Sequence, residues 1–151
     1  MSDPDRFVND GAVVRRLLTT PATWAVVGLS TDRSRAAYGV AAWLRTELGL
    51  RVVPVNPRGE GVFGEPGFRS LAAIPDGEQI AVVDCFVNSR RVGEIVDQAV
   101  AESDRLGIGA VWLQLGVVDA AAAVRARAAG LDVVMDTCPH IEAPHLGIAP
   151  R

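Results

Sequence analysis

The sequence predicts an α/β fold, namely a doubly wound, Rossmann-like sheet of five parallel strands with helices on both faces. Five short apolar runs lead to this prediction, because each is bounded by turn residues in the manner of a strand buried on both sides. Apolar residues at helical spacing occupy most of the intervals between these runs. Strands that alternate with helices are typical of parallel sheets built from right-handed crossovers.

The predicted strands are residues 23–28, 50–55, 80–86, 109–116 and 131–136. Gly28 stops the first run, as a turn residue after a buried strand is expected to do. Pro54 lies within the second run and removes one hydrogen-bond donor from the strand. We therefore expect that strand at a sheet edge or at a bulge.

Amphipathic helices are predicted around Val13–Leu18, before the first strand, and over Val92–Val100, between the third and fourth strands. The last predicted helix covers residues 119–129, with Asp119 as its cap and Gly130 as its end. The stretch 58–79 is rich in glycine and proline, with a short helix expected near its Ser70–Ile74 segment. The C-terminal residues contain several prolines and are expected to be irregular or to form a short docked segment.

The length of 151 residues favours a single domain, so we expect one domain over residues 1–151, with residues 1–8 as a loose leader. The net charge of −3 provides no basic field for nucleic acid or for an anionic membrane surface. All 15 basic residues are arginine, which excludes Schiff-base chemistry and a lysine-bearing phosphate loop. Two widely spaced cysteines and a polar N-terminus favour a reduced, cytoplasmic setting.

In an open α/β sheet, ligands bind beyond the carboxyl ends of the strands, which directs attention to the loop at residues 28–40. This loop has no GxGxxG motif, but Ser30 and Ser34 supply hydroxyl groups and Arg33 and Arg35 supply guanidinium groups. Together with the free N–H groups of the following helix, they suit a pyrophosphate, provided that Asp32 points away. The alternative is a solvated loop with surface arginines.

The turn Asn56–Pro57–Arg58 follows the second strand, where a dinucleotide-binding enzyme would place a carboxylate for the ribose. The nearest acidic residue, Glu47, lies on the preceding helix instead. Arg58 favours a phosphate near the nucleoside, as in NADP or in the 3′-phosphoadenosine of coenzyme A (CoA). The alternative is an ordinary Asn-Pro turn.

The third strand ends at Phe86, which could stack on adenine while Asn88 fixes the edge of the base. The alternative is that Ser89 caps a helix and that Arg90 and Arg91 are surface charges. Gln114 lies within a buried strand and needs a partner, either a ligand, a neighbouring loop or backbone, because an unsatisfied buried amide costs about 1–3 kcal/mol.

No constellation in the sequence predicts catalysis, and we lean against an enzyme without excluding one. Cys138, His140, Glu142 and His145 superficially resemble a metal cluster, but their spacing matches no structural zinc pattern. We therefore predict no metal ligand and no catalytic residue.

Several segments, in order and with matching gaps, resemble the family of small stand-alone CoA-binding domain proteins, from about Thr23 to Glu142. These segments are VVGLS, YGVAAWL, VVPVNP, VWLQLGV and GLDVVMDTCPHIE. This family is similar to the N-terminal CoA-binding domain of the succinyl-CoA synthetase alpha subunit. The resemblance implies a Rossmann-like fold with CoA as the ligand, and it implies no reaction, because the active-site histidine of the synthetase belongs to a domain that this sequence lacks.

The resemblance also implies roles for individual residues. Those at the pyrophosphate, at the start of pantetheine and at the helix behind them would be Gly28, Leu29, Ser30, Tyr38 and Gly39. Those at the nucleotide and its adenine would be Val55, Asn56, Pro57, Phe86, Val87 and Asn88. Gln114 and Gly116 would line the pantetheine exit. Family members often carry arginine where this sequence has Val87, so Arg90 or Arg91 would have to take its place.

Taken together, the sequence favours a protein that binds CoA or acyl-CoA as a small-molecule ligand. Two other functions stay open. One is an NADP-linked oxidoreductase, and the other is an interaction module that has lost its ligand.

Overall fold

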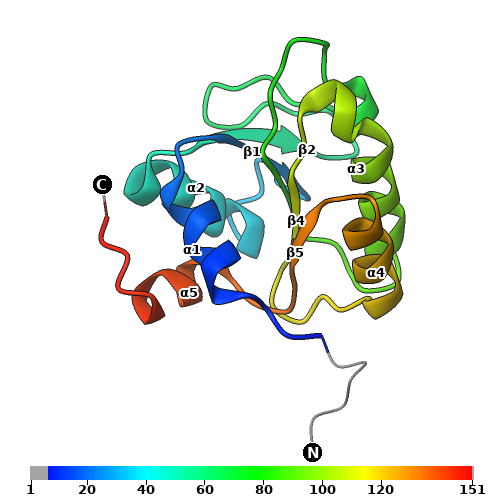
Figure 1. The fold of residues 1–151 in the computed structure, drawn as a ribbon. Helices are drawn as coiled ribbons and strands as arrows, with labels where there is room; N and C mark the ends of the chain where they lie inside the picture. The colour runs from blue at the N-terminus through cyan, green and yellow to red at the C-terminus, as the bar shows by residue number, and fades with distance from the viewer. Residues whose placement is uncertain (1–6, 151) are drawn as a thin grey trace, which may run out of the picture.

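A parallel sheet of five strands forms the centre of the computed structural model, which describes residues 7–150 (Figure 1). The strands are β1 (Thr23–Val27), β2 (Arg51–Val55), β3 (Val82–Cys85), β4 (Ala110–Leu113) and β5 (Asp132–Val134). They lie in the order β2-β1-β3-β4-β5, and every pair is parallel. The strand order reverses between β1 and β3, which is where doubly wound proteins bind their ligands. The predicted fold class is confirmed.

Helices cover both faces of the sheet, as Figure 1 shows. One face carries α1 (Gly11–Thr19), α2 (Ala36–Leu48) and α5 (Pro139–His145), and the other carries α3 (Val92–Leu106) and α4 (Ala120–Ala128). A single turn of 3-10 helix, η1 (Leu71–Ala73), contacts α3. Asp119 caps α4 as predicted, because its carboxylate accepts a hydrogen bond from the backbone N–H of Ala122.

Each face of the sheet buries its own apolar cluster. Trp24 and Trp112 are fully buried under α1, α2 and α5, with ring centroids 5.7 Å apart. The indole N–H of Trp112 donates to the backbone carbonyl of Thr137 at 2.9 Å, which ties the segment before α5 to the sheet. The C-terminal segment, which we expected to be either irregular or docked, therefore contains a short docked helix.

Strand β2 forms one edge of the sheet, as the proline within it predicted. The chain folds back beside it: the N–H of Phe68 donates to the carbonyl of Pro54, and the N–H of Asn56 donates to the carbonyl of Phe68, each at 3.0 Å. At the opposite edge, the side chain of Asn9 accepts from the N–H of Met135 at 2.8 Å and donates to its carbonyl at 2.9 Å.

The strands are shorter than the apolar runs of the sequence, because the last residues of most runs leave the sheet to build the loops at its carboxyl edge. The leader prediction is wrong for Phe7, which packs against the core with the guanidinium of Arg127 4.3 Å above its ring. Residues 1–6 of the predicted leader lie outside the described residues. Between residues 7 and 150, no helix is long and apolar enough to cross a membrane.

Candidate functional site

The loops that follow β1 and β3 touch at the point where the strand order reverses. Gly28 has a φ of 101°, and a Cβ atom at this position would lie only 2.6 Å from the carbonyl oxygen of Phe86. A side chain would thus be both strained and blocked, so only glycine lets the two loops approach so closely. The result is a pair of loops whose positions depend on each other.

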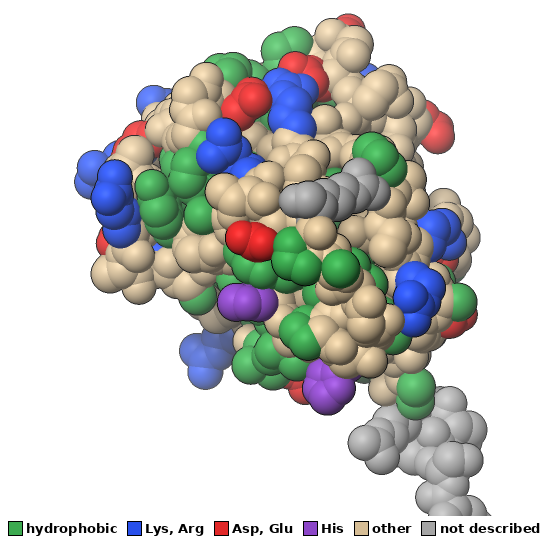
Figure 2. Space-filling model, turned by 90° about the vertical axis from the view of Figure 1, so that its left-hand side faces the viewer, with side chains coloured by type: hydrophobic (Ala, Val, Ile, Leu, Met, Phe, Trp, Pro, Cys, Tyr) green, Lys and Arg blue, Asp and Glu red, His purple; other side chains and the backbone are tan. Residues whose placement is uncertain are grey.

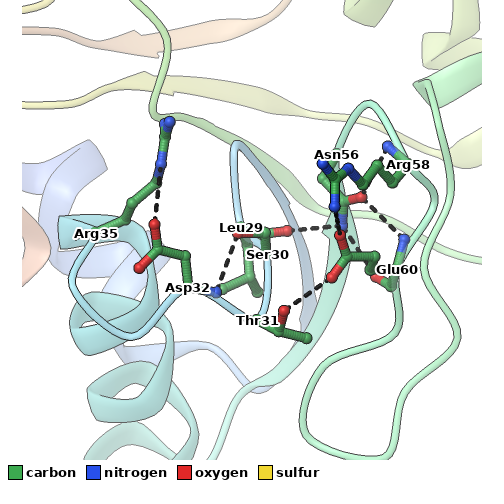
Figure 3. Close-up of polar contacts among 8 residues, drawn as sticks. All are labelled: Leu29, Ser30, Thr31, Asp32, Arg35, Asn56, Arg58 and Glu60. Atoms are coloured by element: carbon green, nitrogen blue, oxygen red, sulfur yellow. Dashed lines mark hydrogen bonds and ion pairs between the residues drawn. The ribbon is translucent and has the colours of Figure 1, made fainter.

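Asn56 joins the loop after β1 to the loop after β2 (Figure 3). Its side-chain amide donates to the carbonyls of Leu29 and Glu60, both at 2.9 Å. Its side-chain oxygen accepts from the N–H groups of Glu60 at 2.9 Å and Arg58 at 3.2 Å. Asn56 is buried, and all its polar atoms are used within the protein, which explains why the turn contains asparagine.

The loop before α2 is held by its own polar side chains. The carboxylate of Asp32 accepts from the Ser34 hydroxyl at 2.6 Å and from the Ser34 N–H at 3.0 Å. It also lies 3.7 Å from the guanidinium of Arg35 (Figure 3). The hydrogen bonds from Ser34 and, to a smaller extent, the charge of Arg35 lower the pKa of Asp32. The Thr31 hydroxyl donates to the carboxylate of Glu60 at 2.8 Å.

A cavity of about 850 Å³ opens between these loops and the start of α3. Ten residues predicted for the ligand line it: Gly28, Ser30, Arg35, Val55, Asn56, Pro57, Arg58, Phe86, Val87 and Asn88. Asp32 and Glu60 also line it. The pyrophosphate interpretation required Asp32 to point away from the site, and the structure contradicts that requirement. Both carboxylates lie close to guanidinium groups, at 3.7 Å from Arg35 and 3.8 Å from Arg58, which offsets part of their charge.

Four arginines surround this cavity: Arg35, Arg58, Arg69 and Arg91. Arg58 has an 86% exposed side chain, and the one ion pair that it makes among residues 7–150, with Glu60, is long at 3.8 Å. Among residues 7–150, no carboxylate pairs with Arg69 or Arg91. Arg69 could not be predicted from the sequence, because its position depends on the loop that returns beside β2 at Phe68.

A second cavity of about 500 Å³ adjoins the first, and Gly28, Arg35, Phe86 and Val87 line both. Its remaining walls come from the start of α2, the loop after β4 and the start of α5. They are Ala36, Ala37, Val40, Gln114, Leu115, Val117, Cys138 and Ile141. Most of these side chains are apolar, in contrast to the charged rim of the larger cavity. Of these eight residues, the sequence predicted only Gln114. Cys138 and Ile141 could not be predicted because they lie in the segment after β5, whose path depends on tertiary contacts.

Other predicted residues line neither cavity: Leu29, Arg33, Ser34, Tyr38, Gly39 and Gly116. Leu29 is fully buried in the core. Arg33 lies 5.7 Å from the centroid of the Tyr38 ring, and that ring packs against Phe63 at 4.9 Å. These residues support the loops from outside the cavities.

The start of α3 differs from the alternative that the sequence offered. The side-chain oxygen of Asn88 accepts from the N–H groups of Arg90 and Arg91, both at 3.1 Å. The Ser89 hydroxyl instead accepts from the N–H of Val118 at 3.0 Å and donates to the carbonyl of Gly116 at 3.4 Å. The alternative in which Ser89 caps this helix is therefore excluded, and Ser89 instead connects the loops after β3 and β4.

Gln114 finds its partner in a buried carboxylate. Its amide donates to Oδ1 of Asp84 at 2.6 Å, while Oδ2 of Asp84 has no partner among the described residues. Burial raises the pKa of Asp84 to about 7, even though the hydrogen bond from Gln114 acts in the opposite direction. Within the protein the partner is thus a side chain of β3, rather than the neighbouring loop or backbone group that the sequence also allowed, and Gln114 still lines the smaller cavity.

Cys138 precedes α5 and is half-buried in the wall of the smaller cavity. Burial raises the pKa of its thiol, and the negative charge of Asp84 adds to this, while the N–H groups of His140 and Ile141 oppose it. Figure 2 shows the molecule from the side of α1, α2 and α5, with hydrophobic side chains around the two exposed histidines. The ring of His140 stacks on Trp43 at 4.7 Å, and no three metal-binding side chains gather within the described part of the chain.

Comparison with known proteins agrees with this arrangement. The family model described as the CoA binding domain matches residues 22–144. A hypothetical protein from Pyrococcus horikoshii OT3 is 33% identical, with 97% of this chain and 96% of that one covered and a TM-score of 0.80. A protein from Thermus thermophilus is also 33% identical, with 91% and 98% covered and a TM-score of 0.77.

A more distant similarity extends to a much larger enzyme. The dinucleotide-forming acetyl-coenzyme A synthetase 1 of Ca. Korarchaeum cryptofilum is 22% identical, with a TM-score of 0.64. The match covers 82% of this chain but 27% of the synthetase, so it shows a shared fold alone. The match to the family model, which includes every strand and nearly all of α5, leads to a firmer conclusion. The chain belongs to the CoA-binding domain family.

Proposed function

We propose that the protein binds CoA or acyl-CoA, with the phosphorylated nucleotide in the larger cavity and the pantetheine arm in the smaller one. The observation that supports this most is the pair of adjoining cavities with unlike walls, one rimmed by guanidinium groups and the other mainly apolar. CoA has the same division, since a charged nucleotide is joined to a neutral arm that ends in a thiol. Membership of the CoA-binding domain family adds support.

The proposal assigns the phosphates to the charged groups of the larger cavity. Ser30 and Arg35 would contact the pyrophosphate near the start of α2. Arg58 and Arg91 would contact the 3′-phosphate, because one is highly exposed and the other pairs with no carboxylate in the described part of the chain. Phe86 would border the adenine, and because it lines both cavities it would lie where nucleotide and arm meet.

The proposal also places the protein in the cytoplasm, because both cysteines are free thiols. It includes no reaction. Catalysis needs groups held against the reacting atoms. In this site the thiol end of the arm would lie near Cys138 and Gln114, which line the smaller cavity.

Isothermal titration calorimetry with CoA, dephospho-CoA and NADPH tests this function. We expect CoA to bind about tenfold or more tightly than dephospho-CoA, because one charge-assisted phosphate contact contributes about 1.5–3 kcal/mol. The substitution Arg91→Ala should weaken CoA binding and leave dephospho-CoA binding nearly unchanged. Arg90→Ala is the matched control, since Arg90 is adjacent and exposed but lines neither cavity.

Each other outcome contradicts a stated part of the proposal. Equal binding of CoA and dephospho-CoA would remove the role given to the arginines. Tighter binding of NADPH would favour the NADP-linked oxidoreductase. No heat of binding and no thermal shift with any of the three would favour the interaction module, because a bound ligand must raise the apparent stability.

A further inference from the structure

Gln114 has a side-chain oxygen that no group of the described chain uses. Its amide nitrogen donates to Oδ1 of Asp84 at 2.6 Å, whereas its Oε1 accepts no hydrogen bond among residues 7–150. Gln114 is only 4% exposed, yet Oε1 is not sealed off, since the buried side-chain atoms without a partner in this part of the chain are Trp24 Nε1 and Asp84 Oδ2. Because Gln114 lines the smaller cavity, its free oxygen is open to that cavity.

The other walls of the smaller cavity provide no second side-chain oxygen. Most of them are apolar, Arg35 has hydrogen-bond donors only, and the thiol of Cys138 is a weak acceptor. A ligand N–H group that leaves water for such a cavity weakens binding unless it finds an acceptor. Among the side chains of the cavity, Gln114 is therefore the one that can select a ligand bearing an N–H group.

Asp84 determines which end of the Gln114 amide faces the cavity. The oxygen and the NH2 group of an amide side chain occupy nearly the same space, so shape alone does not orient it. An ionised carboxylate has only acceptor atoms and can pair with the NH2 group but not with the oxygen. The backbone of Gln114 is fixed as well, because its N–H donates to Cys85 at 3.3 Å and its carbonyl accepts from Val117 at 2.8 Å.

The carboxylate of Asp84 is not explained by stability alone. It is fully buried, and its Oδ2 has no partner among the described residues, although buried polar atoms are nearly always hydrogen-bonded. Asparagine at this position would avoid the cost of a buried charge and keep a hydrogen bond to Gln114. It would also offer both a donor and an acceptor, so it would leave the Gln114 amide free to turn around.

We propose that Gln114 selects the arm of CoA by accepting a hydrogen bond from the amide N–H nearest the thiol end, and that Asp84 is the positioning residue that turns the Gln114 oxygen toward the arm. The inference rests on the proposed binding of CoA in the two cavities. An arm with an ether or carbonyl oxygen in place of this N–H would set a second acceptor against Gln114 and would be rejected.

Calorimetry at pH 8, where Asp84 is mainly ionised because its pKa is about 7, tests the inference with CoA and with adenosine 3′-phosphate 5′-diphosphate, which lacks the arm. The double variant Asp84→Leu/Gln114→Met removes both partners together, so neither is left unpaired. We expect it to bind CoA about three- to tenfold more weakly and the armless nucleotide as tightly as the parent protein does. Gln79→Met is the matched control, since Gln79 is exposed and lines neither cavity.

A further pair of variants separates orientation from stability. Asp84→Asn alone should weaken CoA binding about twofold, because the Gln114 amide then presents its oxygen in about half of the molecules. Asp84→Asn/Gln114→Glu exchanges the amide and the carboxylate, so the new glutamate pairs through one oxygen and turns the other to the cavity. It should recover most of the CoA affinity that the apolar double variant loses.

NMR of the unmodified protein covers the case in which the variants fail to fold. CoA should shift the side-chain carbonyl carbon of Gln114, whereas the armless nucleotide should not. An unshifted Gln114 carbon in a protein that binds CoA, an apolar double variant that binds CoA like the parent, or equal losses for both ligands would overturn the inference. The first two results would leave the proposed CoA binding intact, whereas no heat with CoA in the parent protein would overturn the binding proposal itself.

Discussion

At the scale of single residues, Asn56 connects two loops at the carboxyl edge of the sheet through its buried side chain. Its side chain makes four hydrogen bonds to the backbone of Leu29, Arg58 and Glu60. It therefore joins the loop after β1 to the turn after β2. The sequence marked this position as a contact for the nucleotide, but in the structure its polar atoms are fully used for shaping the cavity.

Replacing Asn56 by alanine should lower the free energy of unfolding by about 1–3 kcal/mol, because buried backbone groups lose their partners. Asn56→Asp should be at least as damaging, since its carboxylate would face the carbonyls of Leu29 and Glu60, which now accept from the amide. Urea denaturation followed by circular dichroism measures both changes. An unfolding midpoint equal to that of the parent protein would contradict this account.

At the scale of elements, α3 holds the long loop between β2 and β3 in place through Arg105. Its guanidinium donates to the carbonyls of Leu71 at 3.1 Å and Ile74 at 2.5 Å, at both ends of η1. It also bonds the carboxylates of Glu102 at 2.6 Å and Asp76 at 3.1 Å. The same loop contributes Arg58 and Arg69 to the larger cavity, so α3 supports that wall from behind.

The substitution Arg105→Lys should loosen this loop, because an ammonium group cannot make the forked contacts to several carbonyls at once. We expect a loss of about 1–2 kcal/mol in stability and faster amide exchange at Ala73 and Ile74 in hydrogen–deuterium exchange. Arg125→Lys is the matched control, because Arg125 bonds the exposed carboxylate of Asp97 between α3 and α4. Equal protection of the loop in both variants would contradict the role of Arg105.

At the scale of the whole molecule, Asp84 links global stability to pH. Its pKa is about 7 in the folded protein and 3.8 in an ordinary setting, so the folded state binds more protons between these values. The free energy of unfolding therefore decreases as the pH rises from about 4 to about 7, by an amount on the order of 4 kcal/mol. The stabilisation is complete below this interval and lost above it.

The variant Asp84→Asn should lack this decrease, because an amide does not titrate. Chemical denaturation at pH 5 and pH 8 should show a smaller difference for the variant than for the parent protein. Asp104→Asn, at an exposed position on α3, should keep the parent slope. A parent protein equally stable at both pH values would contradict the burial argument.

The sequence predicted the layered fold because the strands are uninterrupted apolar runs, and the edge position of β2 because proline removes a donor. It did not predict α5, where Pro139 and Pro144 obscure the helical pattern. It also missed Arg69 and Cys138 as cavity residues, since each reaches the carboxyl edge through a segment whose path depends on tertiary contacts. Local patterns report burial and periodicity, whereas the convergence of distant loops depends on the folded chain as a whole.

The contacts at the two edges of the sheet have a consequence for the behaviour of the protein at high concentration. A bare outer strand is a template on which further strands can stack into fibrils. Here Pro54 offers no donor and its carbonyl is taken by Phe68, while Asn9 occupies both backbone groups of Met135 just beyond β5. Growth of the sheet by added strands is disfavoured on either side, so any self-association of copies should proceed through the helical layers.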